Sequence, residues 1–346
     1  MSGTSRRPLV LDLDTGIDDA LALAYALGSP EVELVAVICS YGNVAVDTAV
    51  RNTHALLELL GYPDIPVYRG TDRALSASAA FEPPEGVARI HGANGLGGQH
   101  IGCMCRRAPG DGVDFLVRSA DAGTQASRDA HFDGKNDVKT GGARGSSFYY
   151  VPTGPLTNLA SALVRAPELA RTLPRVTFMG GALTVPGNVT PCAEANVHND
   201  PEAADVVLRL GLPTRMIGLD VTHQVVLTRE DTARWRALGT SAGVLFADMT
   251  DHYIDIYEQN NPHMGGCALH DPLAVAAAID PSLVGCLGAN LRVDLEGPTR
   301  GRTVCDPERL REAQKTCEVA VTVDAPRFLA EFRKRVGRVL GAPRAR

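Results

Sequence analysis

The chain has 346 residues, of which 45% are hydrophobic and 21% are charged, and its formal net charge is -6. That length can bury a large core, and the composition is that of an ordinary soluble globular protein. The mild acidity, without any long basic run, disfavours nucleic acid and anionic membrane surfaces as partners.

The amino-terminal end lacks the features of a targeting segment. Residues 1–8 are expected to form a flexible lead-in, and the short apolar stretch after them contains acids, so no signal peptide is expected. No apolar run is long enough to span a bilayer. The eight cysteines are scattered and include no C-x-x-C pair, which favours neither zinc nor a disulfide framework. We therefore expect a cytoplasmic protein.

The opening of the folded chain has a strand–turn–helix pattern. Residues 9–28, LVLDLDTGIDDALALAYALG, predict a buried strand, a tight Thr15-Gly16 turn and a helix closed by Gly28. The next elements expected are a strand at 32–38, a helix at 44–60 and a short strand at 66–68. This alternation indicates βαβ units and a parallel sheet.

Four acids crowd into that first corner. Asp18 and Asp19 stand at the helix start. Acids are common there as solvated caps, so a capping role and a role in a functional site are about equally favoured for these two residues. Asp12 and Asp14 lie at the end of a buried strand, where carboxylates are costly. Such a cluster must protonate some of its members or hold a cation. The oxygen-rich, sulfur-free surroundings favour Ca²⁺ or Mg²⁺.

The rhythm changes after residue 69. Residues 70–112 are rich in Gly, Pro and Ala, and we interpret this long loop as a flap. Residues 121–146 form a polar, Gly-rich segment that indicates a surface insertion. The other predicted helices lie at 113–120, 156–165, 201–210, 243–258, 327–340, in a stretch opened by His270-Asp271-Pro272, and in one segment before residue 243. The other predicted strands lie at 147–151, 176–179, 213–219, 291–295 and 318–323.

Polar residues collect at the carboxyl ends of the predicted strands. These positions are Asp14, Asn43, Thr153, Met179 with the loop after it, and Asp220. Ligands bind at that edge of open α/β sheets. We therefore predict an α/β fold with an open, mostly parallel sheet flanked by helices, and a site at the carboxyl ends of its strands. No linker is evident, so residues 9–340 are expected to form one domain, with flexible tails at 1–8 and 341–346.

Three later motifs could contribute to that site. They are Val151-Pro-Thr-Gly-Pro-Leu-Thr-Asn158, Gly187-Asn188 followed by Glu194 and Asn196, and His270-Asp271. The first can aim a carbonyl into the site, but taken alone it favours a plain strand-to-helix turn with Thr157 as the cap. In the second, one acid and two amides can both donate to and accept from sugar hydroxyls, although a polar surface loop would have the same composition. The His-Asp pair alone is a weak signal, because an acid at a helix start is a common cap.

Taken together, these motifs resemble the calcium-dependent, inosine-uridine-preferring nucleoside hydrolase family. The segments LDLDTGIDD, SYGN, VPTGPLTN, FMGGA, GN…AEAN and LHDP occur in the family's order, and the resemblance runs from about Leu9 to Leu340. It implies a Rossmann-like nucleoside hydrolase fold. It also implies cleavage of the N-glycosidic bond of purine or pyrimidine ribonucleosides by a calcium-activated water, giving ribose and free base for nucleoside salvage. Ca²⁺ would be the only cofactor, water the co-substrate, and the assembly a homodimer or homotetramer.

The resemblance also implies roles for individual residues. The metal ligands would be Asp14, Asp19, the carbonyl of Thr153, and Asp271. Asp14 would also be the general base, and His270 the acid that protonates the leaving base. The ribose would contact Asp18, Asn43, Met179, Asn188, Glu194 and Asn196. His91, Tyr253 and Tyr257 would approach the nucleobase, and Asp12 would support the metal ligands from behind.

Three features depart from the family pattern. Thr15 replaces a common proline, and Ala195 stands where some members carry an aromatic residue that closes the base pocket. The insertion at 121–146 is longer than usual. None of these removes an implied ligand, and nucleobase preference stays open between inosine, uridine and a broad range.

Two other functions are compatible with parts of the sequence. Asp12-Leu13-Asp14-Thr15 also resembles the nucleophile loop of Mg²⁺-dependent haloacid-dehalogenase-like phosphatases. That alternative leaves the second acid pair, the Asn/Glu loop and His270-Asp271 unexplained, and no lysine follows an obvious strand end. The other alternative is a non-catalytic nucleoside or ribose binder, against which the complete set of implied ligands and acids argues.

Overall fold

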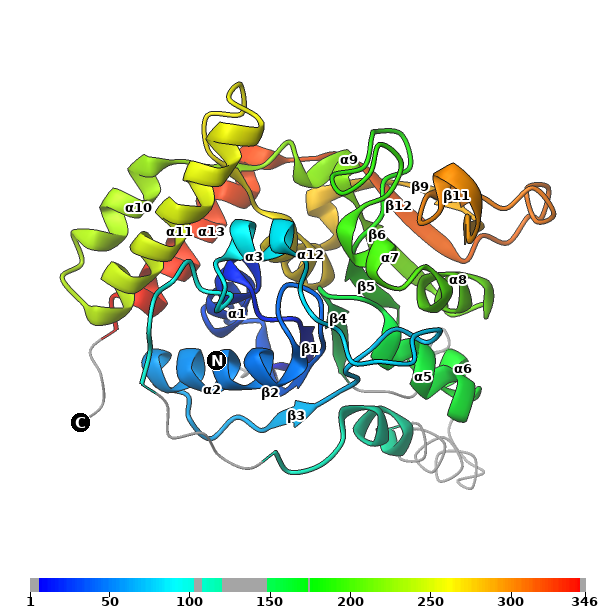
Figure 1. Cartoon of the computed structure of the whole chain (residues 1–346), viewed down its shortest axis with the longest axis horizontal. Helices are drawn as coiled ribbons and strands as arrows, with labels where there is room; N and C mark the ends of the chain where they lie inside the picture. The colour runs from blue at the N-terminus through cyan, green and yellow to red at the C-terminus, as the bar shows by residue number, and fades with distance from the viewer. Residues whose placement is uncertain (1–5, 103–107, 120–147, 174, 343–346) are drawn as a thin grey trace, which may run out of the picture.

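The computed structural model describes residues 6–102, 108–119, 148–173 and 175–342 (Figure 1). The predicted insertion at 121–146 lies outside these ranges, as do Cys103 and Cys105. Within them, parallel strands and helices alternate along the first third of the chain, as the spacing of apolar segments predicts.

The first sheet is built from the opening strands and one strand that returns later. It has the order β3-β2-β1-β4, and every neighbouring pair is parallel. Its strands are β1 (Arg7–Leu13), β2 (Val32–Cys39), β3 (Val67–Arg69) and β4 (Tyr149–Pro152). Between them run α1 (Ile17–Leu27), α2 (Val46–Leu60), α3 (Glu85–His91) and a helix over 112–119.

The second sheet continues the first, because β4 lies against β5. Its order is β5-β6-β12-β9, with β5 (Val176–Met179), β6 (Thr214–Ile217) and β12 (Cys317–Val323) parallel to one another. Only the edge strand β9 (Val284–Ala289) runs antiparallel. The predicted open, mostly parallel sheet flanked by helices is thus confirmed.

The remaining helices cover the sheets and one end of the molecule. They are α5 (Thr157–Arg165), α6 (Leu169–Thr172), α7 (Ala195–Asn199), α8 (Pro201–Arg209), α9 (Leu219–Thr222), α10 (Arg229–Arg236), α11 (Ser241–Asn260), α12 (His270–Ile279) and α13 (Ala325–Leu340). Helices α10, α11 and α13 gather at one end, on the left in Figure 1. The short pairs β7 (Val226–Leu227) with β8 (Cys267–Ala268), and β10 (Leu291–Val293) with β11 (Thr303–Cys305), are antiparallel. Two 3-10 helices span Pro281–Leu283 and Gly297–Thr299.

Alternation along the strands divides the core into two layers. Leu9, Leu11 and Leu13 of β1 point into a core shared with α1, α11, α12 and α13. Val10 points to the other face, which packs against α5 and α8. This alternation follows from the two-residue period of a strand. Because both faces are covered, the strands are almost continuously apolar up to the ends that carry the polar residues.

Three expectations about boundaries are corrected. Strand β1 begins at Arg7, whose guanidinium donates to the Tyr149 hydroxyl (2.5 Å), so the lead-in does not extend to residue 8. The segment 70–112 contains the helix α3, so it is not simply a loop, and the helix predicted at 113–120 is found at 112–119. The loop expected after Met179 includes α7, whose five residues are too few to show a helical apolar period.

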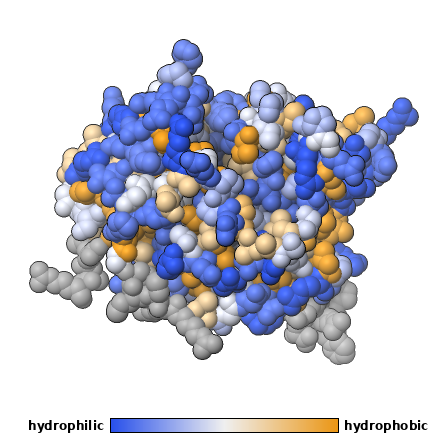
Figure 2. Space-filling view, viewed as in Figure 1, coloured by the Kyte–Doolittle hydropathy of each residue, from blue (hydrophilic) through white to orange (hydrophobic). Residues whose placement is uncertain are grey.

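The surface is mainly hydrophilic on the face seen in Figure 2, with hydrophobic residues in small groups. Among the described residues, no helix has both the length and the apolar character that crossing a bilayer requires.

The packing of α13 on α1 gives a test of the core. The Phe332 ring stacks on Tyr25 at 6.1 Å between ring centroids and meets Phe328 at 5.9 Å. We expect Phe332→Ala to lower the free energy of unfolding by about 3–5 kcal/mol, since it removes a fully buried ring. Chemical denaturation would measure this loss. Lys334→Ala, an exposed position on the same helix, should change stability by less than about 0.5 kcal/mol. Equal losses in the two variants would contradict the assignment of Phe332 to the core.

Candidate functional site

A cavity of about 360 Å³ opens at the carboxyl ends of the central strands. Its lining includes Asp18, Asn43, His91, Thr153, Met179, Asn188, Glu194, Ala195, Asn196, His223, Tyr253, Tyr257, His270 and Asp271. These residues come from nine separate segments that only the fold brings together. Among the described residues that line the cavity there are three carboxylates and no Lys or Arg.

The strand–turn–helix corner supplies the acids of this site. Asp14 follows β1, and Asp18 and Asp19 stand in the first turn of α1. The Gly16 N–H donates to Asp19 Oδ2 at 2.8 Å, so Asp19 caps the helix, and an oxygen of Asp19 also lies within 4.8 Å of oxygens of Asp18 and Asp271. The cap contact of Asp19 is thus confirmed, and its role as a site residue stays a prediction.

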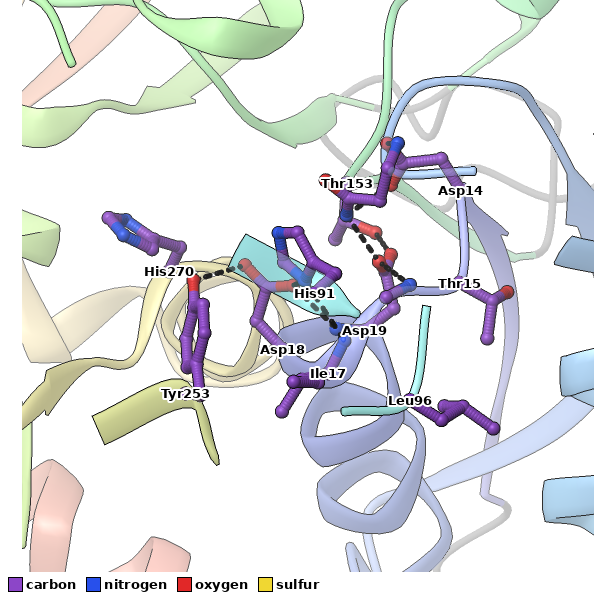
Figure 3. Close-up of polar contacts among 12 residues, drawn as sticks. Asp14, Thr15, Ile17, Asp18, Asp19, His91, Leu96, Thr153, Tyr253 and His270 are labelled. Carbon is purple, nitrogen blue, oxygen red and sulfur yellow. Dashed lines mark hydrogen bonds and ion pairs between the residues drawn. The ribbon is translucent and has the colours of Figure 1, made fainter. Parts of the chain in front are cut away.

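Asn43 holds two of these acids in place. Its backbone N–H donates to Asp14 Oδ2 at 2.7 Å, and its side-chain amide donates to Asp14 Oδ1 at 3.2 Å and to Asp19 Oδ2 at 3.1 Å. The Thr153 hydroxyl donates to Asp19 Oδ1 at 2.7 Å, as Figure 3 shows. Neutral donors from β2 and β4 thus orient carboxylates that belong to the β1–α1 corner.

The acids form a cluster suited to a divalent cation. Oxygens of Asp18, Asp19 and Asp271 lie within 4.8 Å of one another, and all three residues are buried. Burial, followed by the charges of neighbouring carboxylates, raises the pKa of Asp14, of Asp19 and of Asp271. No cationic side chain among the cavity-lining residues offsets this charge. An all-oxygen donor set with a carbonyl, that of Thr153, close by is the kind that Ca²⁺ and Mg²⁺ prefer, so the residues fit such an ion.

Asp12 lies behind the cluster, where it has its own partners. Its carboxylate accepts from the Tyr150 hydroxyl at 2.5 Å and from the Asn158 amide at 2.9 Å. Burial raises its pKa to about 7. Asn158 in turn accepts from the Thr71 N–H at 2.7 Å, which ties the start of the segment 70–112 to the back of the site. Asp12 is outside the cavity lining, as are Asp14 and Asp19, so its supporting role stays a prediction.

The loop between β5 and α7 contributes the amides and one acid. Both oxygens of Glu194 accept backbone N–H groups, Oε1 from Asn196 (2.9 Å) and Oε2 from Gly181 (2.9 Å). Glu194 is the N-cap of α7, and burial raises its pKa. The Asn196 side chain donates to the Thr153 carbonyl at 2.6 Å and to the Met179 carbonyl at 3.2 Å. Asn196 therefore connects this loop directly to the acid corner.

The other end of the cavity carries two histidines and two tyrosines. His270 uses both ring nitrogens, Nδ1 with the Thr222 hydroxyl at 2.8 Å and Nε2 with the Tyr257 hydroxyl at 2.6 Å. Burial lowers the pKa of His270 to about 3. The Tyr253 hydroxyl donates to Asp18 Oδ2 at 3.3 Å, and its ring meets that of Tyr257 edge-on at 4.9 Å. These contacts follow the predicted i, i+4 spacing of the tyrosines on α11.

His91 reaches the same end from α3. Its Nδ1 accepts the Ile17 N–H at 3.3 Å, and its ring lies 5.3 Å from that of Tyr253 (Figure 3). Burial lowers the pKa of His91 to about 4, so the ring is neutral and Nδ1 is the acceptor. The 3.8 Å approach of Nδ1 to Asp18 is therefore not an ion pair.

Of the residues predicted for the site, all but Asp12, Asp14 and Asp19 line this cavity, and hydrogen bonds join Asp14 and Asp19 to the cavity-lining Asn43. One difference concerns the acids, since the closest carboxylate group contains Asp18 whereas the resemblance implies Asp14 as a metal ligand. No role was predicted for Tyr150, Asn158, Thr222 or His223. Thr222 and His223 follow Asp220 by two and three residues, just beyond a predicted strand, and this position is the signal that could have identified them.

Comparisons with known proteins agree on one family. The family model described as "Inosine-uridine preferring nucleoside hydrolase" matches residues 9–330. A relative from Arabidopsis thaliana, "Probable uridine nucleosidase 2", is 36% identical over 93% of this chain and 94% of its own. A pyrimidine-specific ribonucleoside hydrolase from Salmonella schwarzengrund is 33% identical over 93% of this chain and 96% of its own. The solved structure of a purine-preferring ribonucleoside hydrolase from Gardnerella vaginalis is 48% identical, with a TM-score of 0.88 over 97% of this chain and 99% of the other.

Thr15 stands where proline is common in the family that the motifs resemble. Hydrogen bonds hold Thr15 in place, where a proline would be held by its ring. Its hydroxyl pairs with the Thr53 hydroxyl at 2.7 Å, and its carbonyl accepts from the Asn52 amide at 3.1 Å. Both hydroxyls are buried. The turn between Asp14 and Asp18 is thus anchored to α2 by side chains.

This anchor gives a test of the corner's stability. We expect Thr15→Val to lower the free energy of unfolding by about 1–2 kcal/mol, because the buried Thr53 hydroxyl loses its closest partner. The same change in Thr53→Val should cost a similar amount. The double variant should lose less free energy of unfolding than the sum of the two single losses, because it removes both hydroxyls and leaves no unpaired hydroxyl behind. Urea denaturation measures all three, and strictly additive losses would contradict the pairing.

Proposed function

Because this chain belongs to the inosine-uridine preferring nucleoside hydrolase family, we propose that it cleaves ribonucleosides by a calcium-dependent route at this cavity. It is a ribonucleoside hydrolase, an enzyme that breaks the N-glycosidic bond with water. The observation that carries the proposed route is the cluster of buried carboxylates with no cationic side chain among the described residues that line the cavity. The proposed products are ribose and the free base.

The calcium ion would be held by oxygen donors from three segments. The proposed ligands are Asp14, Asp19, the carbonyl of Thr153, and Asp271. Asp18 lies within the same oxygen cluster, but its contact with Tyr253 turns it toward the base end of the cavity. When bound, calcium makes a nearby water a stronger acid.

Asp14 is proposed as the base that receives the proton of the attacking water. Its two oxygens accept from the Asn43 backbone and side chain, which fixes the direction of the carboxylate. A carboxylate held in this way can take a proton without first reorienting.

The ribose end is proposed to stabilise positive charge. Cleavage of an N-glycosidic bond passes through an oxocarbenium-like state, similar to that of glycosidases. Buried carboxylates around the sugar oppose that charge directly, and pre-organised groups do so at little reorganisation cost. The proposed ribose contacts are Asp18, Asn43, Met179, Asn188, Glu194 and Asn196. Because backbone N–H groups already occupy both Glu194 oxygens, Glu194 would use its remaining lone pairs for a sugar hydroxyl.

The leaving base is proposed to receive a proton from the pair of His270 and Tyr257. His270 Nε2 is 2.6 Å from the Tyr257 hydroxyl, and both residues line the cavity. Protonation turns the base into a neutral leaving group, a general acid effect. His91 and Tyr253 would contact the base from α3 and α11.

The scope of the substrate follows from the cavity and the relatives. The relatives named above include both purine-preferring and pyrimidine-specific hydrolases. Ala195 at the start of α7 leaves the cavity wall small there, so we propose that both base classes enter. We further propose a single catalytic domain over 9–340, a homodimer or homotetramer, and a role in cytoplasmic nucleoside salvage.

The hydrolysis reaction should depend on bound calcium. With calcium, the protein should release free base and ribose from inosine or uridine in equal amounts. Prolonged dialysis against a calcium chelator should remove more than about 90% of that rate, and added Ca²⁺ should restore it, since the oxygen cluster needs a hard cation. Chromatography of the bases and a reducing-sugar assay measure both products.

Matched variants sharpen this test. Asp14→Ala should lower kcat at least about 10²-fold, whereas Glu33→Gln, at an exposed position of β2, should retain the wild-type rate. Release of phosphate from a phosphomonoester without base release from a nucleoside would favour the phosphatase alternative. Tight nucleoside binding without turnover would favour the non-catalytic binder.

The contribution of the His270–Tyr257 pair should depend on the leaving group of the substrate. Tyr257→Phe and His270→Ala should each reduce hydrolysis of inosine by about 10²–10⁴-fold, because the base then leaves without a proton. Both variants should lose much less activity on p-nitrophenyl riboside, whose leaving group needs no protonation. Tyr62→Phe, at an exposed tyrosine, serves as the control. Equal losses on the two substrates would exclude the His270–Tyr257 pair as the acid.

A further inference from the structure

His223 lines the cavity beside His270 and has ring nitrogens that are free to bind a ligand. It follows α9, at the carboxyl end of β6, and its ring meets the His270 ring edge-on at 5.6 Å between centroids. Among the described residues, no hydrogen-bond donor or acceptor pairs with either nitrogen of His223. His270, in contrast, has both nitrogens engaged, by Thr222 and by Tyr257.

The backbone under His223 is firmly placed. The Leu219 N–H donates to the Gly181 carbonyl at 2.9 Å, and the Asp220 carboxylate accepts the Leu183 and Thr184 N–H groups at 3.0 and 2.7 Å. The short helix that carries His223 is thus joined to the loop after β5. A polar group on a fixed backbone is suited to setting specificity, since little order is lost when the ligand binds.

Burial of His223 favours the neutral form of its imidazole ring. It is partly buried, which lowers its pKa, while the nearby Asp220 acts in the opposite direction. A neutral imidazole offers one N–H donor and one nitrogen acceptor, and it can exchange them by changing tautomer. Such a group can pair with a carbonyl or with an amine at the same position of a ligand.

Purine chemistry indicates which position that is. N7 and the substituent on carbon 6 lie side by side on one edge of a purine. If the Tyr257–His270 pair delivers its proton to N7 of the purine, His223, which lies next to His270, faces the neighbouring substituent on carbon 6. We propose that His223 is a specificity-determining residue that hydrogen-bonds the substituent on carbon 6 of a purine base. This inference rests on the proposed function, and it selects 6-oxo and 6-amino purine ribosides over a purine without a substituent there.

The test is a cycle of two substrates and two proteins. Inosine carries an oxygen on carbon 6, and purine riboside carries only hydrogen, so their ratio of kcat/KM isolates the contact. In His223→Leu, that ratio should fall about 10-fold below the wild-type ratio, the effect of about one neutral hydrogen bond. Differences in leaving-group chemistry between the two substrates cancel in the cycle.

Further variants separate hydrogen bonding from shape. His223→Gln keeps an amide donor and acceptor and should hold the ratio within about 3-fold of wild type. His100→Leu, at an exposed histidine outside the cavity, should keep the wild-type ratio. If His223→Leu does not fold, His223→Phe provides an aromatic ring without nitrogens for the same comparison.

The outcomes distinguish this inference from the proposed function. An unchanged ratio in His223→Leu, or an equal fall in His223→Gln, would overturn the role of His223 while the hydrolase function stands. A wild-type protein that releases no base from any riboside would overturn both.

Discussion

The burial of several carboxylates in one corner, with no cationic side chain among the described cavity-lining residues, is the constraint on which the site depends. Asp14, Asp18, Asp19 and Asp271 are all buried, and burial followed by mutual repulsion raises the pKa of Asp19 and of Asp271. Isolated burial of even one ionised carboxylate is expensive. Such a cluster is stable only if some of its members are protonated or a cation is bound, and neutral donors lower the cost in either case; the surrounding polar residues are accordingly amides and hydroxyls.

Two asparagines connect this acid corner to the strands of the sheet by hydrogen bonds. Asn43 joins the end of β2 to both Asp14 and Asp19, and Asn196 joins the loop after β5 to the carbonyl of Thr153 at the end of β4. Each asparagine uses several donors at once, so its position is set by more than one strand. A shift of any of these strands would disturb the acids, and this links the geometry of the parallel sheet to that of the site.

The sequence was sufficient for the strand ends and their polar residues, since parallel strands carry such residues to a common edge. It was also sufficient for the i, i+4 placement of Tyr253 and Tyr257, which depends only on helix geometry. It could not reveal that Tyr257 bonds His270, or that Asn196 bonds the Thr153 carbonyl, because these pairs depend on how distant elements pack. The same holds for His223, whose importance arises from its neighbour His270. Asp19 shows that the two interpretations need not exclude each other, because its carboxylate caps the helix and also stands in a cluster of buried acids.

The two ends of the cavity have opposite electrostatic character, and one contact connects them. The acid corner favours a cationic sugar, whereas burial lowers the pKa of His91 and of His270, so that the base end holds neutral histidines. Tyr253 bridges these regions, because its hydroxyl donates to Asp18 while its ring packs on Tyr257 and on His91. A substrate that spans the cavity would place its positively charged ribosyl group among carboxylates and its base among groups able to donate a proton. The separation of charge that accompanies bond cleavage is therefore matched by a separation already built into the wall of the cavity.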